Sequence, residues 1–119
     1  MDPATIVIAA AAVSGASAVQ EITKLAVAGI WSEMKAAIKR KFGADSTAID
    51  VIDEVERLPA GTEPSPMLSN RINELGLANE PDIADALQRM ETLLNERVPG
   101  AIEKQYNFYG NVFHNTNFN

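Results

Sequence analysis

The last fourteen residues of the chain, Tyr106 to Asn119, carry no fixed charge and are rich in aromatic residues and asparagine. As an extended strand they present one mostly apolar face and one face that is largely a row of asparagines. A lone edge strand leaves its backbone amides without partners, whereas stacked copies pair every amide and align the asparagines into ladders. This pattern predicts self-assembly as a cross-β fibril through Tyr106, Asn107, Phe108, Gly110, Asn111, Val112, Phe113, Asn115 and Asn117.

The alternative for this tail is a disordered polar C-terminus, as at the end of many domains. Disordered segments are usually enriched in lysine, glutamate and proline and poor in aromatic residues, and Tyr106 to Asn119 has the opposite composition. We therefore favour self-assembly and keep disorder as the alternative.

A second group of residues suits a membrane surface. A tryptophan and three lysines follow one another at spacings of seven, four and four, which places them on one stripe of a helix, with two further bases beside its end. Indole rings lie at the depth of lipid headgroups, and ammonium groups attract anionic lipid. Alternatively, the tryptophan fills the core, the lysines extend outward, and the bases complement the C-terminal helix dipole. The group consists of Lys24, Trp31, Lys35, Lys39, Arg40 and Lys41.

An uncharged segment, Pro3 to Gln20, precedes this stripe. It is slightly shorter than the roughly 20 strongly apolar residues of a membrane-spanning helix and is rich in alanine, so we do not expect a constitutive anchor. A secretory signal is disfavoured because Asp2 stands where a basic region is required. We expect an apolar stripe of Ile6, Ala9, Ala10 and Val13, flanked by Ile8 and Ala12, to enter lipid; the candidate membrane residues of this segment are Ile6, Val7, Ile8, Ala9 and Val13.

Helices are expected to position the basic stripe and the uncharged segment, because apolar residues before residue 105 recur with a period near 3.6. Capping residues predict five helices. The five helices are expected to begin at Asp2 and Pro3, at Ser17 or Gln20, at Asp45 or Ser46, at Ser65, and at Asn79 or Glu80 followed by Pro81. The second is expected to end at Gly43, the fourth at Gly76 and the fifth at Pro99 and Gly100. The fold class is therefore all-α: a small bundle of about five helices, residues 1–100, followed by an extended amyloid-forming tail, residues 101–119.

The second helix is expected to bury a face that repeats every four residues. Its members are Ile22, Ala26, Ile30, Met34 and Ile38, widened by Leu25 and Ala37. The acids of DVIDEVE, Asp50 to Glu56, are interpreted as the solvated face of the third helix.

Composition argues against several classes of function. A net charge of −6 disfavours nucleic-acid binding, although Met1 to Gly43 has five basic residues against three acidic ones. The chain has no cysteine, and its single histidine, His114, lies in the tail. The residues that a histidine-based metal centre or catalytic pair requires are therefore almost entirely lacking. We find no phosphate-binding glycine loop. We expect neither an enzyme nor a cofactor.

Three segments together resemble the bacterial Bell-domain proteins. They are the opening MDPATIVIAAAAVSGASA, the segment IWSEMKAAIKRKFGADS, whose most particular part is MKAAIKRKFG, and the tail motif NFYGNVFHNTNF. The resemblance implies a helical, membrane-directed cell-death domain, analogous to the fungal HeLo-type domains, with a C-terminal amyloid signalling motif. It also implies a partner: an NLR-like receptor (a nucleotide-binding-oligomerisation-domain protein) that carries a matching motif.

The functional hypothesis is a programmed-cell-death effector of bacterial immunity. The protein is expected to be cytoplasmic when inactive and to permeabilise the cell membrane, whose anionic lipid it contacts, after its tails assemble with copies of themselves. The alternative is a non-lytic helical adaptor that oligomerises and recruits a protein partner.

Overall fold

The computed structural model describes residues 2–16, 19–58 and 65–101, and within these ranges every regular element is a helix. The elements are α1 (Pro3–Gly15), α2 (Glu21–Phe42), α3 (Thr47–Glu56), α4 (Pro66–Glu74), the 3-10 helix η1 (Leu77–Asn79) and α5 (Pro81–Arg97). The predicted all-α body of five helices is confirmed. The predicted cross-β tail lies outside the described residues.

The capping residues identified in the sequence set the helix limits. The side chains of Asp2, Ser46 and Ser65 each accept a hydrogen bond from the backbone amide three residues later. Gly43, with φ of 99°, follows the last residue of α2, and Gly76, with φ of 69°, follows α4. Both backbones lie in the region that favours glycine, so the chain turns where the sequence predicted.

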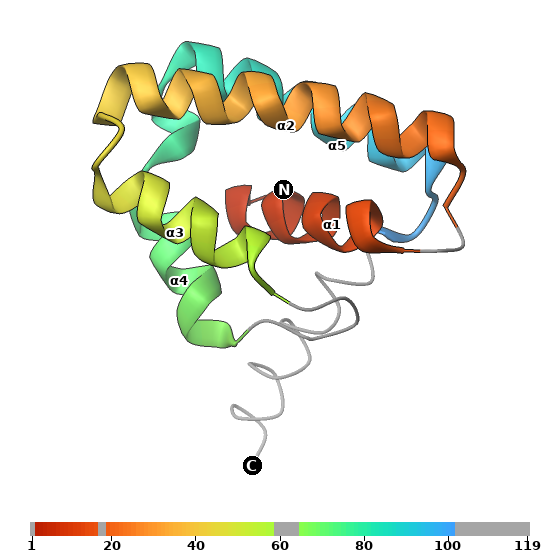
Figure 1. The fold of residues 1–119 in the computed structure, drawn as a ribbon, viewed down its shortest axis with the longest axis horizontal. Coiled ribbons are helices and arrows are strands. Elements are labelled where there is room, and N and C mark those ends of the chain that lie inside the picture. The colour runs from red at the N-terminus through yellow and green to blue at the C-terminus, as the bar shows by residue number, and fades with distance from the viewer. Residues whose placement is uncertain (1, 17–18, 59–64, 102–119) are drawn as a thin grey trace.

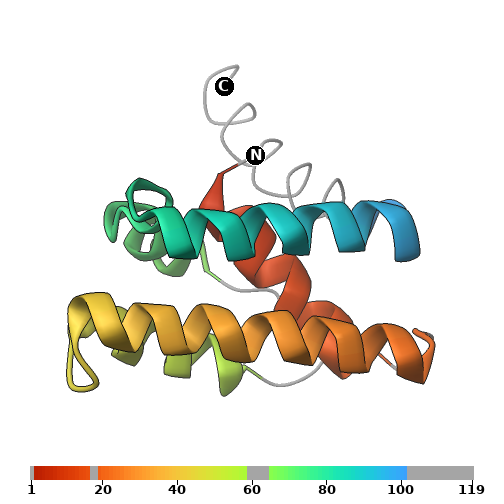
Figure 2. The same cartoon turned by 90° about the horizontal axis from the view of Figure 1, so that it is seen from above.

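The helices form two layers. The long helices α2 and α5 run antiparallel and side by side, as Figures 1 and 2 show from two directions. Helix α1 lies beneath this pair, and the shorter α3 and α4 stack at one end of the molecule (Figure 1). Because α1 contacts α2, α3, α4 and α5, it is the central element of the bundle.

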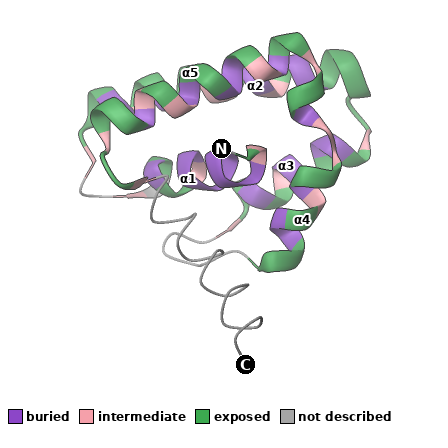
Figure 3. Ribbon diagram, turned by 180° about the vertical axis from the view of Figure 1, so that it is seen from behind, coloured by how far each residue is buried: buried purple, intermediate pink, exposed green. Residues whose placement is uncertain are grey.

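Helix α1 is buried on almost every side (Figure 3). Seven consecutive residues, Ala4 to Ala10, are each no more than 3% exposed. The predicted stripe is therefore only part of the buried surface, and Ala12 lies exposed rather than beside it. Apolar residues all round a helix indicate either a core helix or a membrane helix, and in this conformation α1 is the core helix.

The predicted face of α2 is wrong in its first half. Ile22 and Leu25 are 67% and 65% exposed and Ala26 is exposed, whereas Thr23 and Val27 are buried. A strict repeat of four residues drifts around a helix that turns every 3.6 residues, so Ile22 and Ile38 lie about 160° apart. The buried residues Thr23, Val27, Met34, Ala37 and Ile38 keep the helical period instead.

The N-terminus of α1 has a partner for each of its first amides. Pro3 has no N–H group, the Ala4 amide donates to Oδ1 of Asn73 in α4 over 3.1 Å, and the Thr5 amide donates to Oδ1 of Asp2 over 3.0 Å. The Ile6 amide donates to the backbone carbonyl of Asp2. The side-chain nitrogen of Asn73 also donates to Oδ2 of Asp2. Helix α4 thus completes the cap that holds α1 in place.

This cap predicts a specific loss of stability. Replacing Asn73 with alanine removes the partner of the Ala4 amide, and loss of a helix cap costs typically about 1 kcal/mol. Asn70→Ala is the matched control, because Asn70 is exposed on the same helix and its replacement should change stability by less than about 0.5 kcal/mol. Urea unfolding measures both variants, and equal stabilities would contradict the role of Asn73.

Candidate functional site

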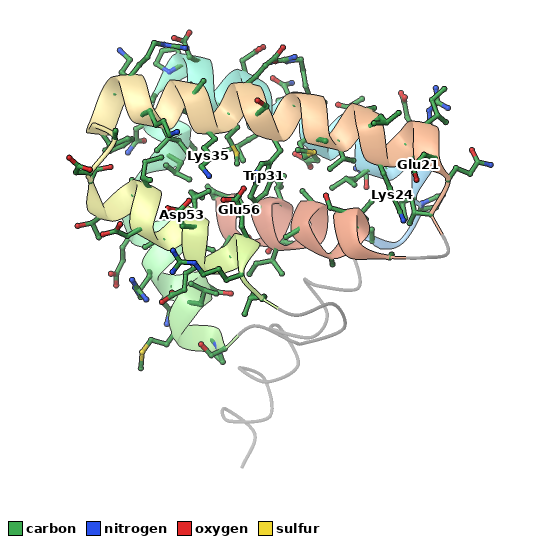
Figure 4. The ribbon with its side chains drawn as sticks, in the orientation of Figure 1. Glu21, Lys24, Trp31, Lys35, Asp53 and Glu56 are labelled. Atoms are coloured by element: carbon green, nitrogen blue, oxygen red, sulfur yellow. The ribbon has the colours of Figure 1, made fainter. Side chains whose placement is uncertain are left out.

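The structure separates the predicted membrane residues into three groups. Ile6, Val7, Ile8, Ala9 and Val13 are buried in the core. Lys39, Arg40 and Lys41 are exposed at the end of α2, and Lys24 is half-buried near its start. Trp31 and Lys35 extend from α2 toward α3 (Figure 4). The tail residues, Tyr106 to Asn117, lie outside the described residues.

The side chains of Trp31 and Lys35 contact two carboxylates of α3. The ammonium Nζ of Lys35 lies 2.7 Å from Oε1 of Glu56 and 3.0 Å from Oδ1 of Asp53. The indole Nε1 of Trp31 donates a hydrogen bond of 3.0 Å to the other oxygen of Glu56, Oε2. We call these four residues the α2–α3 polar cluster. It joins the upper layer to α3 beside the buried helix α1 (Figure 4).

The cluster is a set of charges held at the edge of solvent. The side chains of Lys35, Asp53 and Glu56 are 25%, 32% and 37% exposed. The hydrogen bond from Lys35 to Glu56, and to a smaller extent the one to Asp53, raises the pKa of Lys35 above its ordinary value. The hydrogen bond from Lys35 lowers the pKa of Asp53, and Arg57 adds a weaker attraction of the same sign. Within the cluster, Lys35 and Asp53 therefore stay ionised across the neutral range.

Asp53 and Glu56 sit at an electrostatically unfavourable place in α3. They occupy its last turn, where the helix dipole disfavours negative charge. Lys35 compensates for both, as Arg71 of α4 does for Glu54 at 2.8 Å. From the sequence, these acids were predicted to form a solvated face, and their pairing with Lys35 and Arg71 was not predicted. Acids three residues apart at the C-terminal end of a helix were the available signal, because such a position calls for a cationic partner.

The alternative interpretation of Trp31 also finds partial support. Its ring packs against the hydrophobic core while remaining half-buried. The bases at the end of α2 face acids at the start of α5: Lys41 lies 3.5 Å from Glu80 and Arg40 lies 3.9 Å from Asp82. These exposed pairs complement both helix dipoles, although such pairs contribute little to stability.

Other kinds of site are poorly represented in the described ranges. No group of three or more histidine, cysteine, aspartate or glutamate residues there is arranged to hold a metal ion. None of the helices in these ranges is both long and apolar enough to cross a bilayer. A shallow surface hollow of about 380 Å³ lies on α5 and opens to solvent; it is lined by Asp85, Gln88, Arg89, Thr92, Leu93 and Glu96.

The polar cluster predicts how stability depends on pH. Asp53 has a lowered folded pKa, so its contribution is present above the ordinary value of 3.8 and is lost as the pH falls through the folded pKa. Lys35 has a raised folded pKa, so its contribution is present below 10.5 and is lost as the pH rises through the folded pKa. Lys35→Met should therefore lower the melting temperature by a constant amount between about pH 5 and 9, and by less below about pH 4.

The control for this prediction is Lys39→Met, which removes an exposed lysine one turn further along α2. Its effect on melting should be small at every pH. A deficit of Lys35→Met that persists undiminished at pH 2.5 would contradict the pairing with α3.

Comparison with known proteins identifies the family. A model of the Het-E N-terminal domain matches residues 1–119, the whole chain. This family is related to the HeLo-like cell-death domains and is associated with cell-death and heterokaryon-incompatibility proteins. No curated protein and no solved structure gives a significant match. The helical cell-death part of the resemblance seen in the sequence is thereby supported, and the chain belongs to the Het-E N-terminal domain family.

Proposed function

We propose that this domain is a programmed-cell-death effector that permeabilises membranes after its C-terminal segment drives oligomerisation. The observation that carries the proposal is α1: a helix with no charged residue, apolar on nearly every side and sealed at the centre of a small bundle. A helix of this kind is stable either in a protein core or in lipid. The family association with cell death supports the same function.

Release of α1 requires specific contacts to break. The polar contacts that hold its first turn are those with Asp2 and Asn73, and the polar cluster holds α2 and α3 together beside it. Helix α1 is about 20 Å long, shorter than the roughly 30 Å hydrocarbon core, so in its present form it suits a shallow insertion. Many copies held together would make an individually weak insertion cooperative.

The assembly step rests on the sequence of the tail. An uncharged, aromatic and asparagine-rich strand is suited to templated stacking. The proposed sequence of events begins with an NLR-like receptor that carries a matching motif, as the Bell-domain resemblance implies. The assembled domains then move from the cytoplasm to the anionic inner face of the cell membrane.

The second candidate is a non-lytic adaptor that oligomerises and recruits a protein. The exposed side chains of Ile22 and Leu25 at the start of α2 favour it, because large apolar groups on a surface often mark contact sites. An adaptor should leave vesicles intact at every stage of assembly.

Leakage of anionic vesicles distinguishes the two functions. The 119-residue chain seeded with fibrils of a peptide of residues 105 to 119 should release the vesicle contents, whereas the unseeded chain should not. Charge in the tail should prevent seeding, because Val112→Lys with Phe113→Lys stacks like charges at every layer. Intact vesicles in the presence of seeded fibrils would favour the adaptor.

A charge in α1 tests insertion through this helix. Ala12 is exposed in the bundle, so Ala12→Asp should fold. Because α1 is apolar on nearly every side, the carboxylate would enter lipid with the helix, at a cost that rises with depth toward about 2.5–3.5 kcal/mol at the bilayer centre. We expect leakage to fall at least about tenfold while fibrils still form. Ala78→Asp is the matched control, because Ala78 is an exposed alanine in η1, and it should leak as the unmodified chain does. Undiminished leakage with Ala12→Asp would rule out insertion through α1.

A further inference from the structure

Two donors on one turn of α2 hold both oxygens of a single acid group. Trp31 and Lys35 are four residues apart, so their side chains project side by side from the helix. The indole N–H and the ammonium reach Oε2 and Oε1 of Glu56 over 3.0 and 2.7 Å. One donor is neutral and one is cationic, an arrangement that fits an anion with two oxygens and one negative charge. The same ammonium also pairs with Asp53 over 3.0 Å, and that pair does not involve Trp31.

The diester phosphate of a phospholipid has the same features. It carries one negative charge shared by two non-bridging oxygens, and lysine is a common partner of phosphate. Tryptophan and lysine are also the residue types that favour the headgroup region of a bilayer. The partial exposure of the lysine and the glutamate means that an incoming headgroup meets them at the surface of the molecule rather than within its core.

We propose that Glu56 occupies a phosphate site, and that Trp31 and Lys35 exchange this carboxylate for the headgroup phosphate of an anionic phospholipid when the domain docks at a membrane. The inference deepens the proposed function and rests on it for the choice of a membrane as the partner. Glu56 then competes with the lipid phosphate for the two donors, Trp31 and Lys35.

The distribution of charge supports lipid as the occupant. Helix α2 carries five basic residues against two acidic ones, whereas α3 carries four acids and no base. An anionic surface therefore attracts α2 and repels α3. Exchange at Glu56 leaves the Lys35–Asp53 pair as the remaining polar contact of the cluster and so weakens the attachment of α2 to α3. Because both helices contact α1, their separation would also uncover the buried apolar helix. Lipid binding and the release of α1 become one coupled event.

The single tryptophan of the chain reports directly on this site. Glu56→Gln removes the carboxylate charge that Trp31 and Lys35 share and leaves Asp53 paired with Lys35. Unseeded protein should then bind vesicles of phosphatidylglycerol and phosphatidylcholine about fivefold more tightly than the unmodified chain, with a blue shift of Trp31 emission and quenching by brominated lipid. Glu54→Gln is the matched control: it removes the same charge from the same turn but breaks a pair with Arg71 of α4. It should not reproduce the gain.

A second variant separates geometry from net charge and guards against misfolding. Glu56→Asp keeps the charge but shortens the side chain, so it should lose one of its two contacts and also bind vesicles more tightly, while circular dichroism verifies the helical fold. Adding Lys35→Met to Glu56→Gln should abolish the gain.

Three outcomes would overturn the inference. Equal gains in vesicle binding for Glu54→Gln and Glu56→Gln would mean that only net charge matters. No gain for either Glu56 variant would show that Glu56 does not compete with lipid for Trp31 and Lys35. A shift of Trp31 emission by millimolar inorganic phosphate, without vesicle binding, would assign the site to a soluble anion. Leakage by seeded unmodified protein is measured separately, so the proposed function can stand even where this inference fails.

Discussion

Burial of α1 is the constraint on which the rest of the structure depends. Fully burying a valine or isoleucine side chain contributes roughly 1.5–3 kcal/mol, and α1 places several of them at the centre of the molecule. Each of the other helices contributes one wall around it. Because α1 has no charged face of its own, it cannot serve as a surface helix, so the bundle must close around it or lipid must replace the bundle.

The contacts that close the bundle differ in strength. Apolar burial around α1 is extensive and is not weakened by charge screening, whereas the polar cluster and the Asp2–Asn73 cap are small groups of hydrogen bonds near the surface. A domain in which a few polar contacts near the surface help to hold the helices around an apolar helix can stay closed and yet respond to a competing anionic surface. This combination links the fold to the proposed cell-death function.

Much of the fold followed from local rules, and the remainder depended on contacts between helices. Asp2, Ser46 and Ser65 mark helix starts because a cap is a local hydrogen bond, readable from the sequence. The face of α2 was misassigned at Ile22 and Leu25 because the four-residue spacing departs from the true helical period.

The candidate site was harder to predict than the fold. Trp31 and Lys35 were singled out by their spacing, but Asp53 and Glu56 became partners only through the packing of α3 against α2, which spacing within one helix does not reveal. In the same way, nothing local to α1 indicates that its cap includes Asn73, which is 69 residues away from Ala4 in the chain.

The most direct test of the account follows α1 itself. The chain has no cysteine, so Ala12→Cys supplies a unique attachment point for an environment-sensitive fluorophore at an exposed position of α1. In unseeded protein with anionic vesicles, the label should report water. After seeding, its emission should shift to the blue and be quenched by brominated lipid, while the same label at Ala78→Cys should show neither change. A label at residue 12 that stays in water while the vesicles leak would contradict the release of α1 into the membrane.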